Sequence, residues 1–328
     1  MGLQPHLLAS GGEVAGFDDL RPQGSSIDRR HYDLYMPCIP PGALILLAAA
    51  VSAVETAEAP SRPPWAMQAL ITTEHAADAD LTRHGGSIGV DAMTYEARLF
   101  WNPARGTQLG LGLGGGFWDY DGSRFDDEPT LRAHRLRLGG LQMLSPTWGV
   151  ILQEAVGVAY DGRLPASDGI TTTTFAGPVW RRDADLFIAA GVFFTTARAY
   201  NRAIPMLSVW WRIDESWTLE LFDQIDNLSR ITWRMDERFS AGLRLDVQQI
   251  QFAIEQADGS TGGFRDTHAT IGLECDWRPL GSEALTIRPH VGWAVMRELA
   301  FTDADGDELL NDEAEAAATF GLTLKAAF

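Results

Sequence analysis

The last thirteen residues of the chain, 316–328, alternate without a break between two kinds of side chain. One series is apolar and the other is polar or small: Ala318, Phe320, Leu322, Leu324, Ala326 and Phe328 against Thr319, Gly321, Thr323, Lys325 and Ala327. A period of two is typical of a β-strand with one face in an apolar medium. The closing strand of a transmembrane β-barrel has this pattern, because lipid offers its backbone no hydrogen-bond partner except a neighbouring strand. We therefore expect this segment to pair with the first strand of a barrel; the alternative is an edge strand of a β-sandwich.

The composition does not fit a membrane protein made of helices. The 328 residues are 45% hydrophobic, with 33 glycines, 11 tryptophans and a mean hydropathy of -0.09. A membrane-spanning helix needs about 20 consecutive apolar residues, and the longest largely apolar run, 43–53, is shorter. The formal net charge of -18 argues against nucleic acid as a partner.

The run 43–53 fits the apolar region of a secretory signal peptide. Arg29 and Arg30 precede it, and two small-residue cleavage motifs follow, at 51–53 and 57–59. We predict that residues 1–59 are an N-terminal extension with a cleavable signal peptide and that residues 60–328 form a single β-barrel domain. Met36 is a second candidate start, so the length of the leader stays open.

From Trp65 onward, alternating segments recur without a linker or a helical period. Fourteen strands are expected, at 65–81, 87–101, 107–120, 131–144, 148–160, 170–181, 185–199, 203–213, 217–225, 227–235, 239–253, 265–277, 284–300 and 314–328. Twelve is the alternative count, if short neighbours merge. Most segments reach the roughly 9–11 residues that a tilted strand needs to cross a bilayer. The prediction is an all-β fold, an antiparallel transmembrane β-barrel.

The connections between these segments alternate in length. One set is tight, at 102–106, 145–147, 182–184, 214–216, 236–238 and 278–283; the interleaved set includes long acidic loops at 121–130, 161–169, 256–263 and 302–313. Short turns on one side and long loops on the other are typical of outer-membrane barrels. We expect the tight turns and both ends of the barrel in the periplasm, and the acidic loops outside. Two members of the long set, around Asn201 and Asp226, are short exceptions.

Tryptophans flank nearly every tight turn, namely Trp101, Trp148, Trp180, Trp211, Trp217, Trp233 and Trp277. The indole ring is apolar with one N–H donor, which suits the boundary between membrane and water. The block 211–217, Trp-Arg-Ile-Asp-Glu-Ser-Trp, returns as 233–239, Trp-Arg-Met-Asp-Glu-Arg-Phe. This repetition predicts two hairpins of the same construction beside an aromatic girdle.

The second face of the strands carries charges of both signs, so we expect a polar interior. The candidates to line it are Arg212, Glu220, Arg230, Arg234, Arg244, Asp246, His268, Glu274, Asp276 and Arg288, with Arg98 on an earlier strand. Charges in an apolar interior are costly, so these groups should pair across strands or meet water. His134 and His290 are likewise expected inside, as packed or water-bonded residues.

The segments around the repeated block are similar to a known family. Pro205, Trp211, the run 217–222, the turn 277–279 and the run 322–328 resemble an uncharacterised Gram-negative outer-membrane β-barrel family that is defined only as a domain of unknown function. The similarity spans 65–328 and is strongest after Pro205. Relatives tend to have proline where this chain has Asp223, which predicts a different loop there. The resemblance implies a barrel and an outer-membrane location, and it carries no catalytic or binding residues.

Three motifs have ordinary structural explanations. Residues 85–89 match the G-x-S-x-G nucleophile pattern, but that chemistry needs a strand–turn–helix elbow, and a strand follows here. Residues 110–115 match G-x-G-x-x-G, which small inward residues between lipid-facing leucines explain. Asp303, Asp305 and Asp307 resemble part of a calcium loop, but the spacing is not that of an EF-hand. They remain weak candidates for a divalent cation, and a solvated acidic loop is the alternative.

These observations lead to an outer-membrane barrel that is a passive or selective pore for small polar solutes. The alternatives are a closed structural or surface-binding barrel without transport, and a membrane-embedded hydrolase, for which no Ser/His cluster is evident. No enzyme activity and no cofactor are expected. The expected partners are outer-membrane lipid and lipopolysaccharide, and the barrel-assembly machinery, which would contact the C-terminal strand; the oligomeric state stays open.

Overall fold

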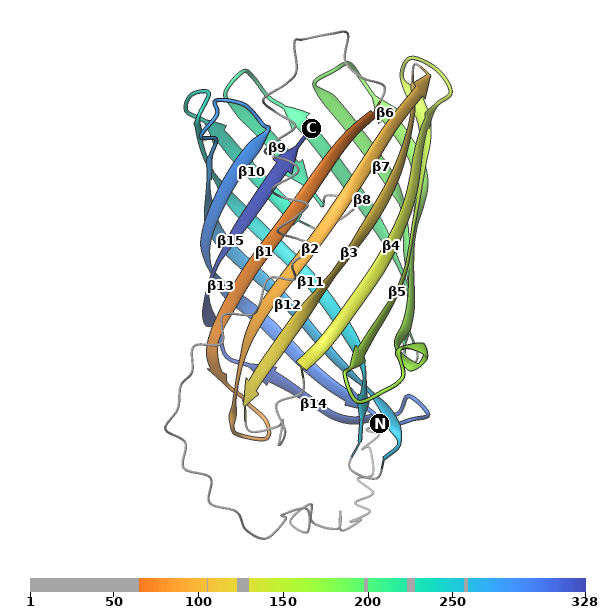
Figure 1. Cartoon of the computed structure of the whole chain (residues 1–328), viewed down its shortest axis with the longest axis vertical. Coiled ribbons are helices and arrows are strands. Elements are labelled where there is room, and N and C mark those ends of the chain that lie inside the picture. Colours follow the sequence, from red (N-terminus) through yellow and green to blue (C-terminus); the bar gives the residue numbers. More distant parts are fainter. Residues whose placement is uncertain (1–64, 105, 123–129, 198–199, 223–227, 257–258) are drawn as a thin grey trace, which may run out of the picture. The chain divides into compact units, whose positions relative to one another are not determined.

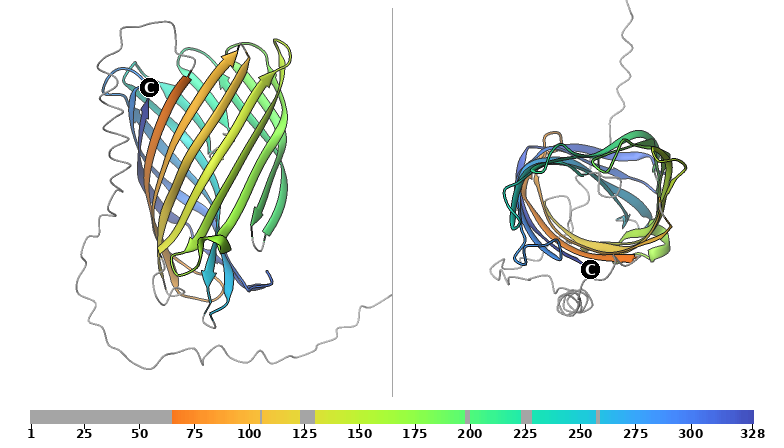
Figure 2. Two further views of the ribbon diagram at one scale, coloured as in Figure 1. Left: turned by 45° about the vertical axis from the view of Figure 1, so that its right-hand side comes forward. Right: turned by 90° about the horizontal axis from the view of Figure 1, so that it is seen from above.

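The computed structural model describes residues 65–104, 106–122, 130–197, 200–222, 228–256 and 259–328. The predicted extension and signal peptide lie outside these residues. Within them the chain forms one antiparallel sheet that closes on itself (Figures 1 and 2), as predicted. Its strands are β1 (Trp65–Asp80), β2 (Ser87–Ala104), β3 (Thr107–Gly122), β4 (Thr130–Met143), β5 (Trp148–Asp161), β6 (Ile170–Arg181), β7 (Leu186–Ala197), β8 (Tyr200–Arg212), β9 (Trp217–Leu221), β10 (Leu228–Arg234), β11 (Phe239–Glu255), β12 (Thr261–Trp277), β13 (Leu285–Thr302), β14 (Glu308–Ala314) and β15 (Ala317–Ala327). A short 3-10 helix, η2 (Ala166–Gly169), precedes β6.

The C-terminal segment closes the barrel. β15 pairs with β1 over nine residue pairs, from Gln68 opposite Ala327 to Ala76 opposite Thr319. Beyond them, the backbone N–H of Phe328 donates to the carbonyl of Met67 at 2.9 Å. The expectation that the alternating terminal strand pairs with the first strand is confirmed.

The sheet has fourteen positions around the wall, because β14 and β15 share one of them. β13 pairs with β15 through Leu285–Ala294 and with β14 through 297–302. The wall position is therefore one strand interrupted at 315–316. This corrects the expectation of an acidic loop over 302–313, since residues 308–314 are in β14 and Asp312 is buried. The Asp312 carboxylate accepts hydrogen bonds from the backbone N–H groups of Arg83 and His84, which follow β1.

We call the end of the barrel that carries the tight connections the turn end; it is uppermost in Figure 1, and the opposite end is the loop end. Three tight turns are built in the same way. The side-chain oxygens of Asp183, Asp214 and Asp236 each accept hydrogen bonds from the backbone N–H groups two and three residues later, at 2.6–3.0 Å. Ser145 does the same more weakly, at 3.3 and 2.9 Å. Such side-chain turns explain why the Asp-Glu block recurs.

Hydrogen bonding at these turns favours the ionised carboxylate. The Arg182 guanidinium, with the backbone N–H of Asp185, lowers the pKa of Asp183. The backbone N–H groups of Arg238 and Phe239 lower the pKa of Asp236. Both turns are therefore more stable when their aspartates are charged.

The outer surface has an apolar band bordered by tryptophans at the turn end. Leucines such as Leu111, Leu138 and Leu273 stand exposed along it. The predicted girdle is present, with Trp101, Trp148, Trp217, Trp233 and Trp277 exposed beside the turns. Trp217, which ends the first block, and Trp233, which begins the second, pair across β9 and β10 and stack at 6.2 Å between ring centroids. An exposed apolar band with an aromatic edge is the surface of a barrel that lies in lipid.

None of the described residues belongs to a helix that is long and apolar enough to cross a membrane.

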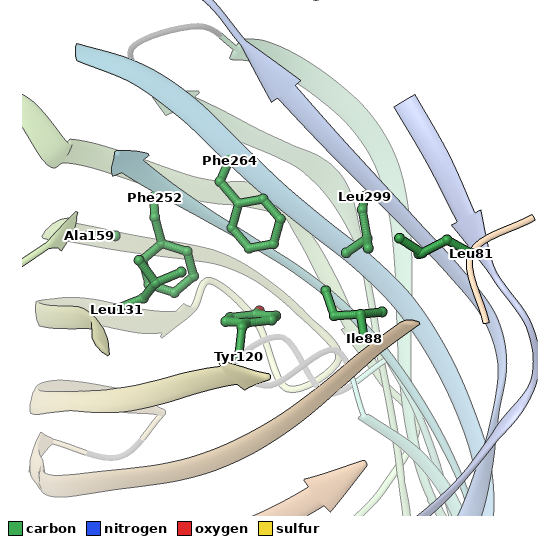
Figure 3. Packing of buried hydrophobic residues seen from close by; sticks show 8 residues of the cluster. All are labelled: Leu81, Ile88, Tyr120, Leu131, Ala159, Phe252, Phe264 and Leu299. Atoms are coloured by element: carbon green, nitrogen blue, oxygen red, sulfur yellow. The ribbon is translucent and has the colours of Figure 1, made fainter. Parts of the chain in front are cut away.

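The interior at the loop end is largely apolar around the buried ion pair of Asp266 and Arg297, which was not predicted from the sequence. Eight buried side chains, which we call the apolar plug, meet there (Figure 3): Leu81, Ile88, Tyr120, Leu131, Ala159, Phe252, Phe264 and Leu299. The rings of Tyr120 and Phe264 lie edge to face at 5.0 Å, and those of Trp118 and Phe252 at 5.4 Å. The expected polar interior is thus found between this layer and the turn end, and within the layer the Tyr120 hydroxyl donates to the buried Asp266 carboxylate at 3.0 Å.

β11 reaches a second strand at the loop end while it stays paired with β12 along its whole length. Ala253 of β11 pairs with Tyr160 of β5 in a parallel bridge, although these strands are six places apart in the sheet. Thr261 at the start of β12 also donates to Asp168 of η2 at 3.2 Å. Apart from Leu81, which follows β1, the plug residues lie on β2–β5 and β11–β13, and none of them lies on β6–β10.

Candidate functional site

A cavity of about 960 Å³ occupies the barrel between the plug and the turn end. Every strand of the wall except β14 contributes to its border, from Leu70 of β1 to Thr323 of β15. On β3 the inward positions are Gly110, Gly112 and Gly114, while Leu109, Leu111 and Leu113 are exposed on the outer face. The predicted structural role of this glycine-rich run is confirmed. A Cβ on Gly112 would lie 3.2 Å from Glu96 Oε1 and 3.3 Å from Arg137 Cβ, so the missing side chain leaves room for charged neighbours.

One charged group, which we call the Glu96 cluster, lies on β2 and β4. The Glu96 carboxylate is 7% exposed, and Arg98 donates to its Oε2 at 2.9 Å. Arg135 and Arg137 approach the same carboxylate at 3.4 Å each. Three cations share one anion, so this side of the cavity is electropositive.

A second charged group, which we call the β9–β13 cluster, lies on the facing wall. Arg230 forms an ion pair with Glu220 and lies 3.8 Å from Glu274. Arg288 donates to Asp276 at 2.5 Å and lies 3.9 Å from Glu274. The charges alternate along neighbouring strands, which offsets the cost of placing them inside a barrel.

Several buried polar atoms beside this cluster have no hydrogen-bond partner among the described residues. They include both ring nitrogens of His290, Thr270 Oγ1, Arg244 Nε and Asp246 Oδ1. Leaving such groups dry costs about 1–3 kcal/mol each. Buried polar atoms that lack a protein partner are usually satisfied by ordered water. The chemistry of this wall therefore fits a hydrated cavity.

The sequence candidates divide into three groups by position. Arg244, Asp246, Glu274 and Arg288 border the cavity, as does Arg98. Glu220, Arg230 and Asp276 belong to the β9–β13 cluster, and His268 Nδ1 lies 3.4 Å from Asp266 Oδ1 beside the plug. Arg212 and Arg234 lie at the turn end instead. Arg212 Nε donates to Asp185 Oδ1 at 2.6 Å, and Arg234 Nε donates to the carbonyl of Asp236 at 3.3 Å.

Most of the Glu96 cluster was not predicted from the sequence. Arg135 and Arg137 alternate with Leu136 and Leu138 on β4, and both leucines are exposed on the outer face. That alternation is a signal that could have identified both arginines as inward. His134 was expected inside but shares the face of the two leucines, and its ring bonds Tyr95 Oη at 3.0 Å on the outer surface.

The acidic residues proposed for a divalent cation serve the turn between β13 and β14. Asp303 Oδ1 accepts the backbone N–H groups of Asp305 and Asp307 at 2.9 Å each. Over the residues that the structure describes, no group of three or more His, Cys, Asp or Glu side chains is placed to hold a metal ion. The carboxylate of Asp303 is thus used to stabilise the loop.

The serine motif opens a strand, not a helix. Ser87 is the first residue of β2, so the elbow that a nucleophilic serine requires is not formed there. His134 Nδ1 is hydrogen-bonded to Tyr95, and His268 Nδ1 is hydrogen-bonded to Asp266. Neither ring nitrogen of His290 has a hydrogen-bond partner among the described residues. None of these three histidines is paired with a serine.

Comparison with known proteins places the chain in a family without an assigned activity. The family model described as Domain of unknown function (DUF6268) matches residues 130–328, which confirms the predicted resemblance to an uncharacterised outer-membrane barrel family. No curated protein has a matching sequence.

Solved structures with a similar arrangement are outer-membrane barrels of low sequence identity. An outer membrane channel from Pseudomonas putida F1 is 8% identical, with a TM-score of 0.47, over 83% of this chain and 100% of that one. The translocator domain of the autotransporter NalP from Neisseria meningitidis is 9% identical, with a TM-score of 0.34, over 86% and 96%. The toluene transporter TodX from P. putida is 7% identical, with a TM-score of 0.36, over 82% and 91%.

Proposed function

The chain belongs to the family described as Domain of unknown function (DUF6268), and from its barrel we propose that it is an outer-membrane channel for small polar solutes. The observation that carries this proposal is the cavity of about 960 Å³ between the two charged clusters. Its buried polar atoms call for water, and a hydrated passage through a lipid-embedded barrel conducts ions. The turn end then faces the periplasm and the loop end faces outside.

The charges around the cavity predict a preference for anions. Inward-facing arginines at its border outnumber inward-facing carboxylates: Arg98, Arg135, Arg137, Arg202, Arg244 and Arg288 against Glu74, Glu96, Asp246 and Glu274. This balance is opposite to the net charge of the whole chain. The acidic residues are therefore concentrated away from the passage, which keeps the path itself electropositive.

Single-channel recording in planar bilayers tests the proposal. Full-length protein should give discrete conductance steps, and the reversal potential in a salt gradient should indicate anion selectivity. Arg135→Glu should shift the reversal potential toward cations, while Arg83→Glu, at an exposed ion pair near the loop end, should not. Folded protein that gives no conductance would contradict the channel.

One observation favours a second candidate, a closed barrel that has a structural or surface-binding role. The apolar plug blocks the axis at the loop end, and its residue Tyr120 is 2% exposed. A closed barrel predicts no conductance in wild-type protein but conductance after plug residues are truncated. The Phe264→Ala variant distinguishes the two candidates.

A further inference from the structure

The wall of the barrel is incomplete between β8 and β11. β9 has five residues and β10 seven, whereas β8 has 13 and β11 has 17. β8 pairs with β9 only through Val209–Arg212, and β10 pairs with β11 only as far as Asp246. Beyond these pairs, no strand in the described part of the chain is hydrogen-bonded to the free edge of β8 or to the free edge of β11. The one exception is Ala253 of β11, which bridges to β5. The strands predicted at 217–225 and 227–235 are thus too long, and residues 223–227 lie outside the described residues.

The end of the short hairpin is specified by its own contacts. Phe222 adopts a positive φ of 45°, which a β-strand does not allow. Its backbone N–H donates to the side-chain oxygen of Ser229 at 2.9 Å, and Ser229 is buried. Backbone strain of this kind persists only where the surroundings fix it. The strand therefore ends at Leu221 because of local structure.

The missing part of the wall lies at the depth of the membrane. With about 3.3 Å of rise per residue and a tilt of about 40°, a strand gains about 2.5 Å of height per residue. Leu221 follows Trp217 of the girdle by four residues, and Leu228 precedes Trp233 by five. The hairpin therefore stays paired for only about 10–13 Å of an apolar band about 25 Å tall. Both short strands lie near the turn end (Figure 1).

The cavity reaches this gap from inside. Six consecutive residues of β11, 246–251, border it, as do four of β8, 204–207. Only one face of a wall strand normally borders the interior, unless small inward residues expose the backbone. The inward residues here are large, among them Ile250 and Met206. The cavity therefore borders the two strand edges that have no ladder partner among the described residues.

The alternative exit along the axis is obstructed. Phe252 of β11 joins the apolar plug (Figure 3), and Ala253 next to it bridges to Tyr160 of β5. The strand that forms one edge of the gap therefore also carries part of the plug. Unpaired strand edges in lipid are costly, so water or a ligand must satisfy the backbone of this gap.

We infer that the gap between β8 and β11 is a lateral opening through which an elongated amphipathic molecule moves between the cavity and the outer leaflet of the membrane. Its border is apolar near the hairpin, at Leu221, Phe222 and Leu228, which suits an alkyl chain. Polar groups follow farther from the turn end. The buried Gln251 Nε2 has no partner among the described residues, and Arg202 borders the cavity beyond Ile204. These groups suit a polar or anionic end. The inference goes beyond the proposed passage of small polar solutes and does not require ion conductance.

Fluorescence quenching by a fatty acid tests the opening. Full-length protein with Cys38→Ser and Cys275→Ser receives one new cysteine, labelled with bimane, in phosphatidylcholine proteoliposomes. Met206→Cys places the label inside the barrel beside the gap, and Leu243→Cys places it on the lipid-facing surface, where the leucine is exposed. Doxyl-stearic acid should quench the Met206 label to an extent comparable with the Leu243 label. Doxyl attached to phospholipid should quench only the Leu243 label strongly.

Filling the gap provides the second arm. Leu228→Trp combined with Val247→Trp should remove most of the quenching at Met206 by doxyl-stearic acid. Leu273→Trp, on the lipid-facing surface away from the gap, is the matched control and should leave it unchanged. The Leu243 label and the heat-modifiable mobility of the barrel report folding in every variant.

Two results would overturn the lateral opening. One is a Met206 label that doxyl-stearic acid does not quench in folded protein. The other is quenching that persists unchanged in the gap-filled variant, because the probe would then enter elsewhere. The conductance of the same proteins is recorded separately. A barrel that conducts ions but does not admit the fatty acid would contradict only the lateral opening. A barrel that admits the fatty acid but does not conduct would contradict only the proposed channel.

Discussion

Replacement of Glu96 by glutamine should destabilise the barrel and strengthen its preference for anions. Glu96→Gln keeps the shape of the side chain but removes the negative charge of a carboxylate that Arg98, Arg135 and Arg137 share. The Arg98 bond, at 2.9 Å, is charge-assisted and buried, and such bonds are worth about 1.5–3 kcal/mol. The two contacts at 3.4 Å add less, because Arg135 is 42% exposed and water screens it.

We therefore expect the free energy of unfolding to fall by about 2 kcal/mol. Urea unfolding in detergent micelles, followed by tryptophan fluorescence, measures this change. Glu313→Gln is the matched control, since its pair with Arg83 is half exposed on both sides, and it should change the free energy by less than about 0.5 kcal/mol.

The electrical readout is independent of the stability readout. Loss of the Glu96 charge makes the Glu96 cluster more positive by one unit, so the reversal potential in a salt gradient should move further toward the anion value. Equal destabilisation by Glu96→Gln and Glu313→Gln, together with an unchanged reversal potential, would refute the assignment of this cluster to the wall of a conducting passage.

Three further predictions concern the plug, the turns and the closing strand. Phe264→Ala should lower the free energy of unfolding by about 3–5 kcal/mol, since the ring is buried against Tyr120 and Phe301. The same variant should raise single-channel conductance, and an unchanged current would show that the plug does not limit the ion current. The lowered pKa values of Asp183 and Asp236 mean that their contribution is complete above the unfolded pKa of about 3.9 and is lost as pH falls through the folded values. Asp236→Asn should therefore reduce the loss of stability in acid-unfolding curves below about pH 4, and a curve that matches wild type would contradict this. Deletion of 320–328 removes most of the pairing between β15 and β1 and should abolish the heat-modifiable folded band in electrophoresis, whereas a preserved band would contradict closure by this strand.

The strands could be predicted from the sequence because each face of a barrel strand lies in one kind of environment, lipid outside and the barrel interior inside. The girdle tryptophans and the Asp-x-x turn residues mark where each strand starts at the turn end, and those boundaries agree with the structure. The loop end carries no such markers. The alternation around Phe222 continues past Leu221, so it could not show that a positive φ ends the strand there.

The site was predictable only in part because alternation gives the face of a residue but not its height. Arg212 and Arg234 have inward parity with Arg230 and Arg244, yet they lie at the turn end, where Asp185 and the backbone of Asp236 bind them. The apolar plug was hidden for the same reason. Phe252 and Phe264 are partners on the neighbouring strands β11 and β12, but Tyr120 lies on the distant strand β3, and only closure of the sheet brings it to the same level.

The bridge between β11 and β5 has no local signal in the sequence. It joins Ala253 and Tyr160, which are far apart in the chain. β11 also carries Phe252 of the plug and one edge of the gap beside β8. Alternation along this strand shows neither feature.

The central claim is that current passes through the cavity between the two charged clusters, and chemical modification of its wall tests this most directly. Thr94 borders the cavity on β2, so Thr94→Cys in a background of Cys38→Ser and Cys275→Ser provides a single reactive site there. During single-channel recording, a bulky water-soluble methanethiosulfonate should lower the open-channel current of this variant in one step per barrel and leave the lipid-facing variant Leu243→Cys unaffected. A current that does not change after complete labelling of Thr94→Cys would contradict the claim.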